Sequence, residues 1–169
     1  TQDPVTGDPV DPATLFAESK GGEVGLRWEP NDTFNLSAAV FALDFDSELI
    51  YLGDSGVSEP SDPTRRRGLE VAAFWNPVDW LAFDASYAYS HSRFKDAPSG
   101  LDRVPNTVEG VAAAGVTWLP GDGWEGSLRV RYLGPGPLIE DNSVRAPSTT
   151  LVNAGISKTF GQFEVGLDI

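Results

Sequence analysis

The chain has 169 residues and a net charge of −13, and 40% of its residues are hydrophobic while 22% are charged. This composition is not that of a disordered chain, and the acidic balance argues against a nucleic-acid partner because phosphate binding relies on lysine and arginine. The chain has no cysteine and one histidine, His91, which excludes disulfides, cysteine–zinc sites, thiol catalysis and histidine-rich metal sites.

Alternating apolar and polar residues recur along the chain, and no stretch has the i, i+3, i+4, i+7 spacing of an amphipathic helix. In the first predicted strand, Val24, Leu26 and Trp28 share one face. In the second strand the apolar phase changes near Phe41, which predicts a β-bulge there. Eight strands are predicted in all, at about 18–29, 33–52, 64–75, 80–94, 104–119, from Trp124 onward, at 149–160 and from Gln162 to the end.

The connections between the predicted strands alternate between short and long. The sequences PND, NPVD, LPGDG and GQ are typical of tight turns, whereas the segments 53–63, 95–103 and 139–147 are long and polar. Hairpins with short turns at one end and long loops at the other are typical of outer-membrane barrels. The strands are also longer than the roughly five or six residues usual in globular sheets. No apolar run reaches the roughly 20 residues of a transmembrane helix, but alternating barrel strands do not need one.

All five tryptophans lie next to the predicted short turns. Indole rings favour the interface between lipid headgroups and hydrocarbon, so this placement predicts an aromatic girdle at one end of a membrane barrel. A soluble antiparallel β protein, with tryptophans near turns by chance, remains the alternative. In the membrane barrel the apolar face contacts lipid and the charged face points into an aqueous lumen. The tryptophans are Trp28, Trp75, Trp80, Trp118 and Trp124, and the charged residues expected to point inward are Glu23, Arg27, Asp44, Asp46, Glu48, Glu70, Asp84, Glu109, Arg129 and Arg131.

Other chemistry has little support in the sequence. The alternating carboxylates of Asp44, Asp46 and Glu48 could share a calcium ion, but no glycine-turn loop of EF-hand type accompanies them, and lumenal carboxylates explain the pattern. No GxSxG, P-loop or HExxH motif occurs, and His91 is interpreted as a polar residue near an outer strand end. We therefore expect neither an enzyme nor a cofactor.

Three stretches together resemble the late barrel strands of TonB-dependent outer-membrane receptors. They are FALDFDSELIYLGDSG at 41–56, RRRGLEVAAFWNPVDWLAFDASYAYSHSRF at 65–94 and LRVRYLGPGPLIEDNSVRAPSTTLVNAGI at 128–156. In the second stretch an arginine–glycine–apolar–glutamate run opens a strand, a proline turn follows, and an aromatic-rich strand returns. The resemblance covers roughly 18–169 and depends on the order of the motifs.

The resemblance implies an all-β fold, namely an antiparallel up-and-down transmembrane β-barrel segment with about eight strands of a larger 22-strand barrel. Residues 1–17 would belong to an extracellular loop, and 18–169 would form a partial barrel truncated at both ends. The implied function is TonB-dependent uptake of a scarce nutrient, above all a ferric siderophore or another metal chelate, across the bacterial outer membrane. The alternatives are a small self-contained outer-membrane β-barrel with a structural or adhesive role, and a soluble ligand-binding β-barrel.

The resemblance also implies a set of partners. These are outer-membrane lipid and lipopolysaccharide, the receptor's own plug domain, an inner-membrane energising complex that acts through the plug, and the small-molecule metal chelate. Nucleic acid is not expected among them.

The candidate ligand-binding residues lie at the long-loop end of the predicted sheet. In the receptor interpretation the long loops are extracellular and border the ligand vestibule, so their charged residues are candidates for ligand contact. The arginine run that opens the third predicted strand could attract anionic lipopolysaccharide or an anionic ligand. No catalytic or metal-ligating residue is predicted. The candidates are Arg65, Arg67, Arg103, Glu140, Asp141 and Arg145.

Overall fold

A computed structural model describes residues 17–52 and 57–169 of the chain, so the predicted extracellular segment 1–17 lies almost wholly outside the described residues. The described residues contain no helix that could cross a membrane. Four short strands form two small hairpins, β3 (Leu49–Leu52) with β4 (Val57–Pro60) and β9 (Gly136–Pro137) with β10 (Arg145–Ala146). The principal strands are β1 (Ser19–Asn31), β2 (Phe34–Phe45), β5 (Thr64–Val78), β6 (Leu81–Phe94), β7 (Gly110–Gly121), β8 (Trp124–Leu133), β11 (Thr149–Phe160) and β12 (Phe163–Asp168).

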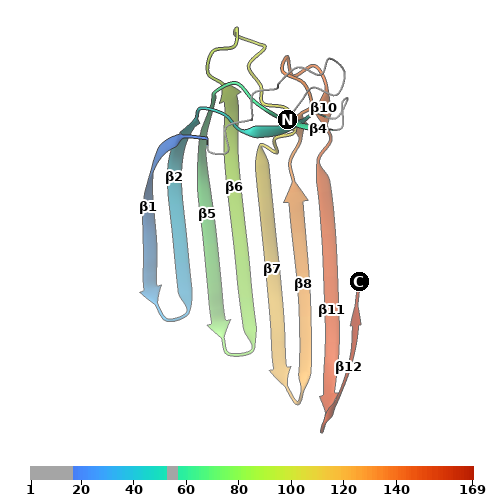
Figure 1. Cartoon of the computed structure of the whole chain (residues 1–169). Helices are drawn as coiled ribbons and strands as arrows, with labels where there is room; N and C mark the ends of the chain where they lie inside the picture. The colour runs from blue at the N-terminus through green and yellow to red at the C-terminus, as the bar shows by residue number, and fades with distance from the viewer. Residues whose placement is uncertain (1–16, 53–56) are drawn as a thin grey trace.

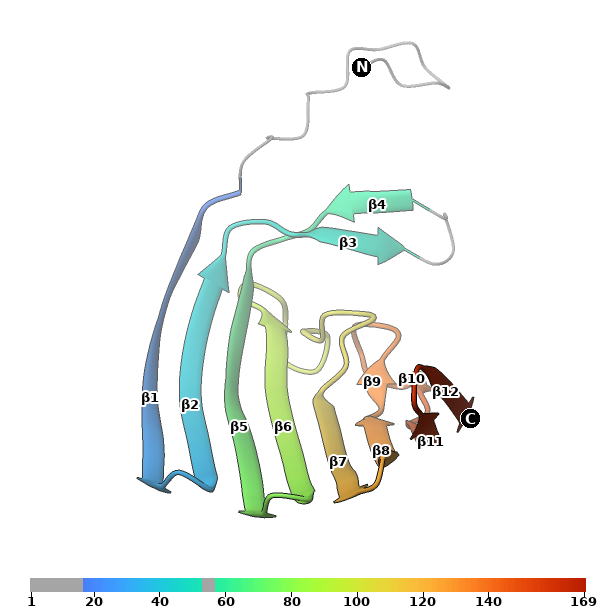
Figure 2. The ribbon, with the colours of Figure 1, turned by 90° about the horizontal axis from the view of Figure 1, so that it is seen from below.

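The principal strands form one antiparallel sheet, in the order β1-β2-β5-β6-β7-β8-β11-β12. Tight turns lie at the lower end of this sheet and the longer connections at the upper end (Figure 1). The predicted all-β, up-and-down architecture with eight strands is therefore confirmed. Strands β1 and β12 are the two edges and do not pair with each other, so the described sheet is an open, curved segment (Figure 2).

One face of the sheet is apolar across all eight strands. Cross-strand pairing places Val24, Val40, Leu69 and Tyr89 side by side on four successive strands. These side chains are not covered: Val24 on the edge strand is 75% exposed, and Val71 on the interior strand β5 is still 37% exposed. In a water-soluble domain such residues would form the core. A continuous exposed apolar face of this extent indicates contact with lipid or with another apolar surface.

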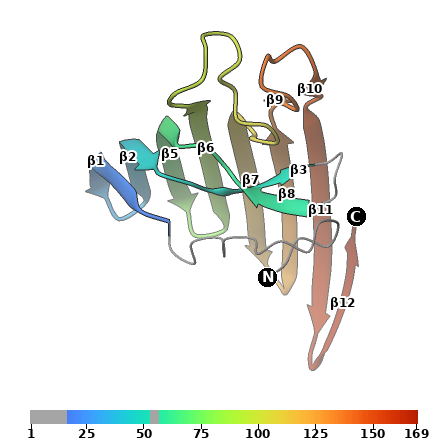
Figure 3. The same ribbon diagram turned by 45° about the horizontal axis from the view of Figure 1, so that its top comes forward.

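The polar face lies on the concave side of the sheet. Figures 2 and 3 show the β3–β4 hairpin crossing the concave side near the upper ends of the strands. Thr64 and Arg66, in the polar phase of β5, both donate hydrogen bonds to the carboxylate of Glu48, which lies just before β3. The polar side chains and the hairpin are therefore on the same side, and the apolar face is convex. A membrane barrel requires this arrangement, because its outer face meets lipid.

The change of apolar phase near Phe41 is not a β-bulge. Pairing with β5 runs without interruption along the whole of β2, so Asp44 keeps the phase of Val40 and lies on the convex face. The predictions of a bulge and of an inward-pointing Asp44 are therefore wrong. The physical reason is a change of environment along the strand: above Val40 the convex face becomes ionic, where Asp44 binds Arg65, while Phe45 faces the concave side next to the hairpin.

The most deeply buried residues lie beneath the connections at the upper end of the sheet. Val104 is 1% exposed, Thr64 is fully buried and Ser92 is 6% exposed. The fifth strand was predicted to begin at Val104, but β7 begins at Gly110. Asn106 adopts a positive φ of 60°, a turn conformation that interrupts an extended strand, so the segment before β7 folds over the end of the sheet.

The tryptophans lie at the short-turn end, as predicted. Trp28, Trp75 and Trp118 stand on the convex face near the ends of their strands. The five tryptophans of the chain are between 40% and 52% exposed. The ammonium group of Lys158, which occupies the apolar phase of β11, lies 4.9 Å from the ring centroid of Trp124. A belt of tryptophan with a neighbouring lysine is typical of a membrane–water interface.

Candidate functional site

A carboxylate at the upper end of the sheet joins two of the long connections. Glu109, just before β7, accepts a hydrogen bond from Nη1 of Arg103 at 2.7 Å and another from Nη2 of Arg145 at 2.6 Å. Arg103 belongs to the β6–β7 connection and Arg145 to the β8–β11 connection. The three side chains are only 20% to 31% exposed, which makes these charge-assisted bonds stronger than pairs in open solvent.

Backbone hydrogen bonds reinforce this junction between the two connections. The N–H of Arg103 donates to the carbonyl of Glu140 at 3.1 Å, and the N–H of Asn106 donates to the carbonyl of Pro137 at 2.8 Å. Main-chain bonds of this kind fix the position of each connection relative to the other. The upper rim of the sheet is therefore held as a unit at this point.

A cleft of about 330 Å³ lies between the same two connections. On its border, the carboxylate of Asp141 accepts a hydrogen bond from the backbone N–H of Ser143 at 2.8 Å. This bond lowers the pKa of the exposed Asp141 carboxyl below its usual value, because it stabilises the ionised form. The cleft therefore offers cationic and anionic groups together to an oxygen-rich ligand. Its lining consists of Arg93, Ser99, Gly100, Asp102, Arg103, Asp141 and Asn142.

Four of the six candidate ligand-binding residues lie together at this rim. Arg103 and Arg145 share one carboxylate, the carbonyl of Glu140 accepts the backbone bond from Arg103, and Asp141 borders the cleft. They come from connections that are far apart in the sequence, so their proximity is a product of the fold. Their contact with a ligand stays a prediction.

The other two candidates, Arg65 and Arg67, lie on the convex face of β5 and make no bond to Glu109. They have the same phase on β5 as Leu69, which belongs to the apolar face. Arg65 forms a two-point ion pair with Asp44, with distances of 2.7 and 3.0 Å. A ligand of these two arginines would therefore bind on the outer side of the sheet and not on its concave side.

The alternating carboxylates that could have shared a calcium ion do not lie together. Asp44 lies on the convex face with Arg65, while Glu48 binds Arg66 and Thr64 on the concave side. Among the described residues, no group of three or more histidines, cysteines, aspartates and glutamates is arranged to hold a metal ion.

A second recess, of about 370 Å³, lies beneath the β3–β4 hairpin and was not found by sequence reasoning. Its border includes the ion pair of Glu48 with Arg66 and the nearly buried Ser92. Within the ranges that the structure describes, the Ser92 hydroxyl oxygen has no hydrogen-bond partner, and a buried hydroxyl in this position can bond a polar group of a ligand. The sequence contains only a weak sign of this recess. Ser92 shares one face of β6 with Ser86 and Ser90, so nothing in the pattern distinguishes it from them.

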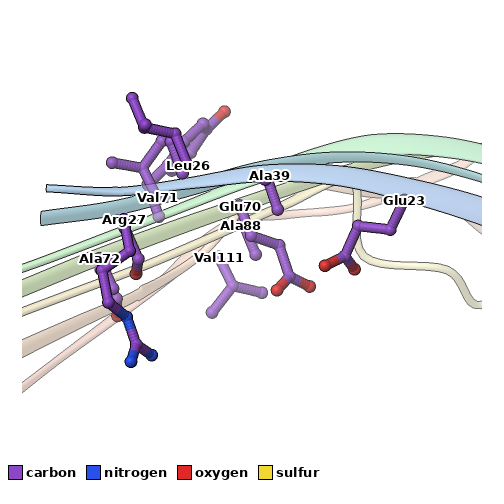
Figure 4. A pocket seen from close by; sticks show the side chains of 14 residues that line it. Glu23, Leu26, Arg27, Ala39, Glu70, Val71, Ala72, Ala88 and Val111 are labelled. Carbon is purple, nitrogen blue, oxygen red and sulfur yellow. The ribbon is translucent and has the colours of Figure 1, made fainter.

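Lower on the concave face lies a shallow trough of about 590 Å³. Figure 4 shows Glu23, Arg27 and Glu70 on this side of the strands, and Leu26 and Val71 on the opposite side. The trough exists because many neighbouring side chains are small, and its few charged groups do not converge on one point. It is best described as the polar face of a curved sheet. The small side chains labelled in Figure 4 are Ala39, Ala72 and Ala88.

Comparison with known proteins agrees with the two-faced geometry. Residues 17–169 match the family described as "TonB dependent receptor-like, beta-barrel". The chain belongs to this family. The resemblance inferred from the order of the motifs is therefore confirmed, and the convex apolar face is the outer face of a β-barrel segment.

Individual relatives cover most of this chain. The ferrioxamine receptor of Yersinia enterocolitica is 27% identical over 148 residues, which are 86% of this chain and 21% of that protein. The structure of the ferric yersiniabactin uptake receptor of Yersinia pestis aligns with a TM-score of 0.69 and 20% identity, over 84% of this chain and 22% of that one. The ferric-catecholate import receptor of E. coli K12, in its closed form, aligns with a TM-score of 0.70 and 18% identity, over 90% and 23%. The chain thus spans only about a fifth of the length of these relatives, and the solved structures show the shared fold.

Proposed function

We propose that the full-length protein is an outer-membrane receptor that takes up a metal chelate, above all a ferric siderophore, in a TonB-dependent manner. The observation that carries this proposal is the convex apolar face of a sheet that belongs to the TonB-dependent receptor-like family. Further support comes from the relatives, which are receptors for ferrioxamine, for ferric yersiniabactin and for ferric catecholates.

In this proposal the convex face contacts the hydrocarbon of the outer membrane and the concave face borders the lumen. The tryptophans mark the interface at the short-turn end, which would be periplasmic, and the long connections would be extracellular. A plug domain elsewhere in the full-length protein would fill the lumen and would contact an inner-membrane energising complex. The charged concave residues, such as Glu70 and Arg131, would then face water or the plug.

The proposed ligand contact is the rim built around Glu109. Arg103 and Arg145 each direct part of a guanidinium group toward this carboxylate, and guanidinium groups also bind the anionic oxygens of other ligands in a two-point manner. A chelate that offers carboxylate, catecholate or hydroxamate oxygens would bind the other N–H donors of these guanidinium groups while Glu109 holds the two arginines in position. Glu140 and Asp141 border the same region and would favour ligands with exposed hydrogen-bond donors.

Deletion of the full-length gene tests this proposal. The deletion strain should lose growth on at least one member of a panel of ferric chelates under iron limitation, and the wild-type gene should restore it. Restoration with a Glu109→Gln variant should require about tenfold more chelate, because a charge-assisted network is broken. Restoration with Glu125→Gln, which removes a carboxylate at the opposite end of the concave face, should match the wild type. Unchanged uptake of every labelled ferric chelate in the deletion strain would contradict the proposal.

A further inference from the structure

The recess beneath the β3–β4 hairpin is lined in part by the buried hydroxyl residue Ser92. Ser92 is 6% exposed and lies opposite Arg66 in the register of β6 with β5, on the concave face. Among the residues that the structure describes, none forms a hydrogen bond with its Oγ atom. Most buried hydroxyls in folded proteins are hydrogen-bonded, and an unpaired one lowers stability. A polar ligand group in the recess would supply this bond.

The two charged side chains that line the recess neutralise each other. Both carboxylate oxygens of Glu48 are in use: Oε1 accepts hydrogen bonds from Thr64 and from Nε of Arg66, and Oε2 accepts one from Nη2 of Arg66. The side chains of Glu48 and Arg66 are only 16% and 31% exposed. A charged ligand group would lose water here and would have to compete for a counter-ion that is already paired, which is unfavourable. An uncharged polar group avoids this penalty.

Apolar side chains on the border of the recess remain exposed. Leu49 is 74% exposed and Val108 is 44% exposed, so a ligand could bury apolar surface against both. The volume of about 370 Å³ is near the lower limit of small-molecule sites, which is about 300 Å³. The recess therefore fits one organic arm of a chelate better than a whole metal chelate.

The recess and the rim around Glu109 share one segment of the chain. Residues 104–108 line the recess, and the residues on either side of this segment, Arg103 and Glu109, bind each other at the rim. Within the segment, Oγ1 of Thr107 donates a hydrogen bond to the carbonyl of Val104 at 2.8 Å. A chelate held at the rim is therefore close enough to place an arm in the recess.

We propose that the recess is a specificity subsite for an uncharged, hydrogen-bonding arm of the chelate, such as an amide, and that Ser92 is its specificity-determining residue. The inference rests on the proposed function and adds the substrate class. The rim contacts the oxygens around the metal, while the recess selects chelates by the charge of the organic arm. Arms that end in a carboxylate or an ammonium group bind poorly, because Glu48 and Arg66 are already paired with each other.

Three forms of ferrioxamine B test this inference, because it is a ferric trihydroxamate with one free arm that ends in an amine. Acetylation makes this arm uncharged, succinylation gives it a carboxylate, and the parent compound keeps an ammonium group. The affinity for each compound is measured with the full-length receptor in detergent, as the wild type, Ser92→Ala and Ser86→Ala. Ser86 is the matched control, because it shares the face of β6 with Ser92 but lies lower, in the shallow trough.

The wild type should bind the acetylated compound at least about tenfold more tightly than the two charged compounds. Ser92→Ala should lose about fivefold in affinity for the acetylated compound, because one hydrogen bond is removed. Ser86→Ala should stay within about twofold of the wild type. Equal affinities for the three compounds, binding of none of them, or equal affinities in the wild type and Ser92→Ala would each overturn the inference.

Denaturant unfolding separates a ligand-binding role of Ser92 from a structural role. Without a chelate, Ser92→Ala should unfold at the same denaturant concentration as the wild type or at a higher one, because a hydroxyl is removed from a buried position. Unfolding at a lower concentration would show that the hydroxyl stabilises the fold, and would overturn the inference.

The gene deletion keeps the two proposals apart. If the deletion strain loses growth on a ferric chelate while the receptor binds none of the three compounds, only the substrate class is wrong. If its uptake of every ferric chelate is unchanged, the proposed function itself fails.

Discussion

Asp84 and Arg129 form a two-point ion pair across the concave face, with Nη1–Oδ2 and Nη2–Oδ1 distances of 2.9 and 2.8 Å. They are not on neighbouring strands, because Asp84 is on β6, Arg129 is on β8, and β7 lies between them. The register places Gly115 of β7 between the two residues. The pair spans the intervening strand because that position has no side chain.

A side chain at position 115 should break this pair. A Cβ atom there would lie 2.6 Å from Oδ1 of Asp84 and 2.9 Å from Nη2 of Arg129, so both groups would have to move. We expect Gly115→Ala to lower the free energy of unfolding of the full-length receptor by about 0.5–1 kcal/mol, the usual value for a partly exposed pair. Denaturant unfolding in detergent measures this difference.

Gly22→Ala is the matched control for this substitution, because a Cβ atom at position 22 meets nothing within 4 Å. It should leave stability unchanged or raise it slightly, since alanine reduces the freedom of the unfolded chain. Equal effects of the two substitutions would contradict the steric explanation.

An arginine on the convex face should be far more costly than one on the concave face. Val71 and Ala72 are neighbours on β5 and point to opposite sides of the sheet (Figure 4). Charge on the lipid face near the bilayer midplane costs about 2–4 kcal/mol. Val71→Arg should therefore make the free energy of folding of the receptor into vesicles less favourable by that amount. Ala72→Arg should change it by less than about 1 kcal/mol. A larger effect at position 72 would reverse the assignment of the two faces.

Lys158 should contribute to stability at the short-turn end. Its ammonium group lies over the Trp124 ring at 4.9 Å and near the Phe160 ring at 5.8 Å, and it donates a hydrogen bond to the carbonyl of Asp122. Lys158→Met removes the cation–π contact and the bond, so we expect a loss of about 1 kcal/mol in unfolding free energy. Lys20→Met, at an exposed position of the other end, should change it by less than about 0.5 kcal/mol.

Removal of the Glu109 carboxylate should loosen the rim. In Glu109→Ala, Arg103 and Arg145 lose their shared partner while they remain partly buried, and the two connections should open more often. Limited trypsin digestion of the folded receptor should then cleave near Lys95 or Arg145 several-fold faster than in the wild type. Glu140→Ala serves as the control, because the bond between Glu140 and Arg103 uses the backbone carbonyl. Equal cleavage rates in the Glu109→Ala variant and the wild type would show that the carboxylate does not hold the loops.

The strand pattern was predictable because alternation on a membrane-facing sheet is set by solvent on one side and hydrocarbon on the other. Strand β11 was predicted with its observed bounds, 149–160. The prediction failed at Phe41 and Asp44, where the environment of each face changes along an unbroken strand. An apolar residue in the sequence indicates that its side chain lies in an apolar environment. The apolar pattern therefore indicates which face a residue is on only where the environment of each face stays the same along the strand.

The site was less predictable than the fold. The loop positions of Arg103 and Arg145 made them candidates, but Glu109 was predicted only as one of several lumenal carboxylates, because nothing local shows that two distant arginines converge on it. The cluster of cations at the upper ends of β5 and β6 was only partly predictable. The arginine run at Arg65 was recognised in the sequence, but Arg93 lies beside it only through the cross-strand register, which the sequence does not specify on its own.

Accessibility of single spin labels at positions 71 and 72 tests the central claim most directly. The chain has no cysteine of its own, so Val71→Cys and Ala72→Cys can each be labelled in a full-length receptor freed of other cysteines and reconstituted in vesicles. The account predicts that the label at 71 is relaxed mainly by oxygen dissolved in lipid, and the label at 72 mainly by a water-soluble nickel chelate. Relaxation of the label at 71 by the water-soluble reagent, with the label at 72 in lipid, would contradict it.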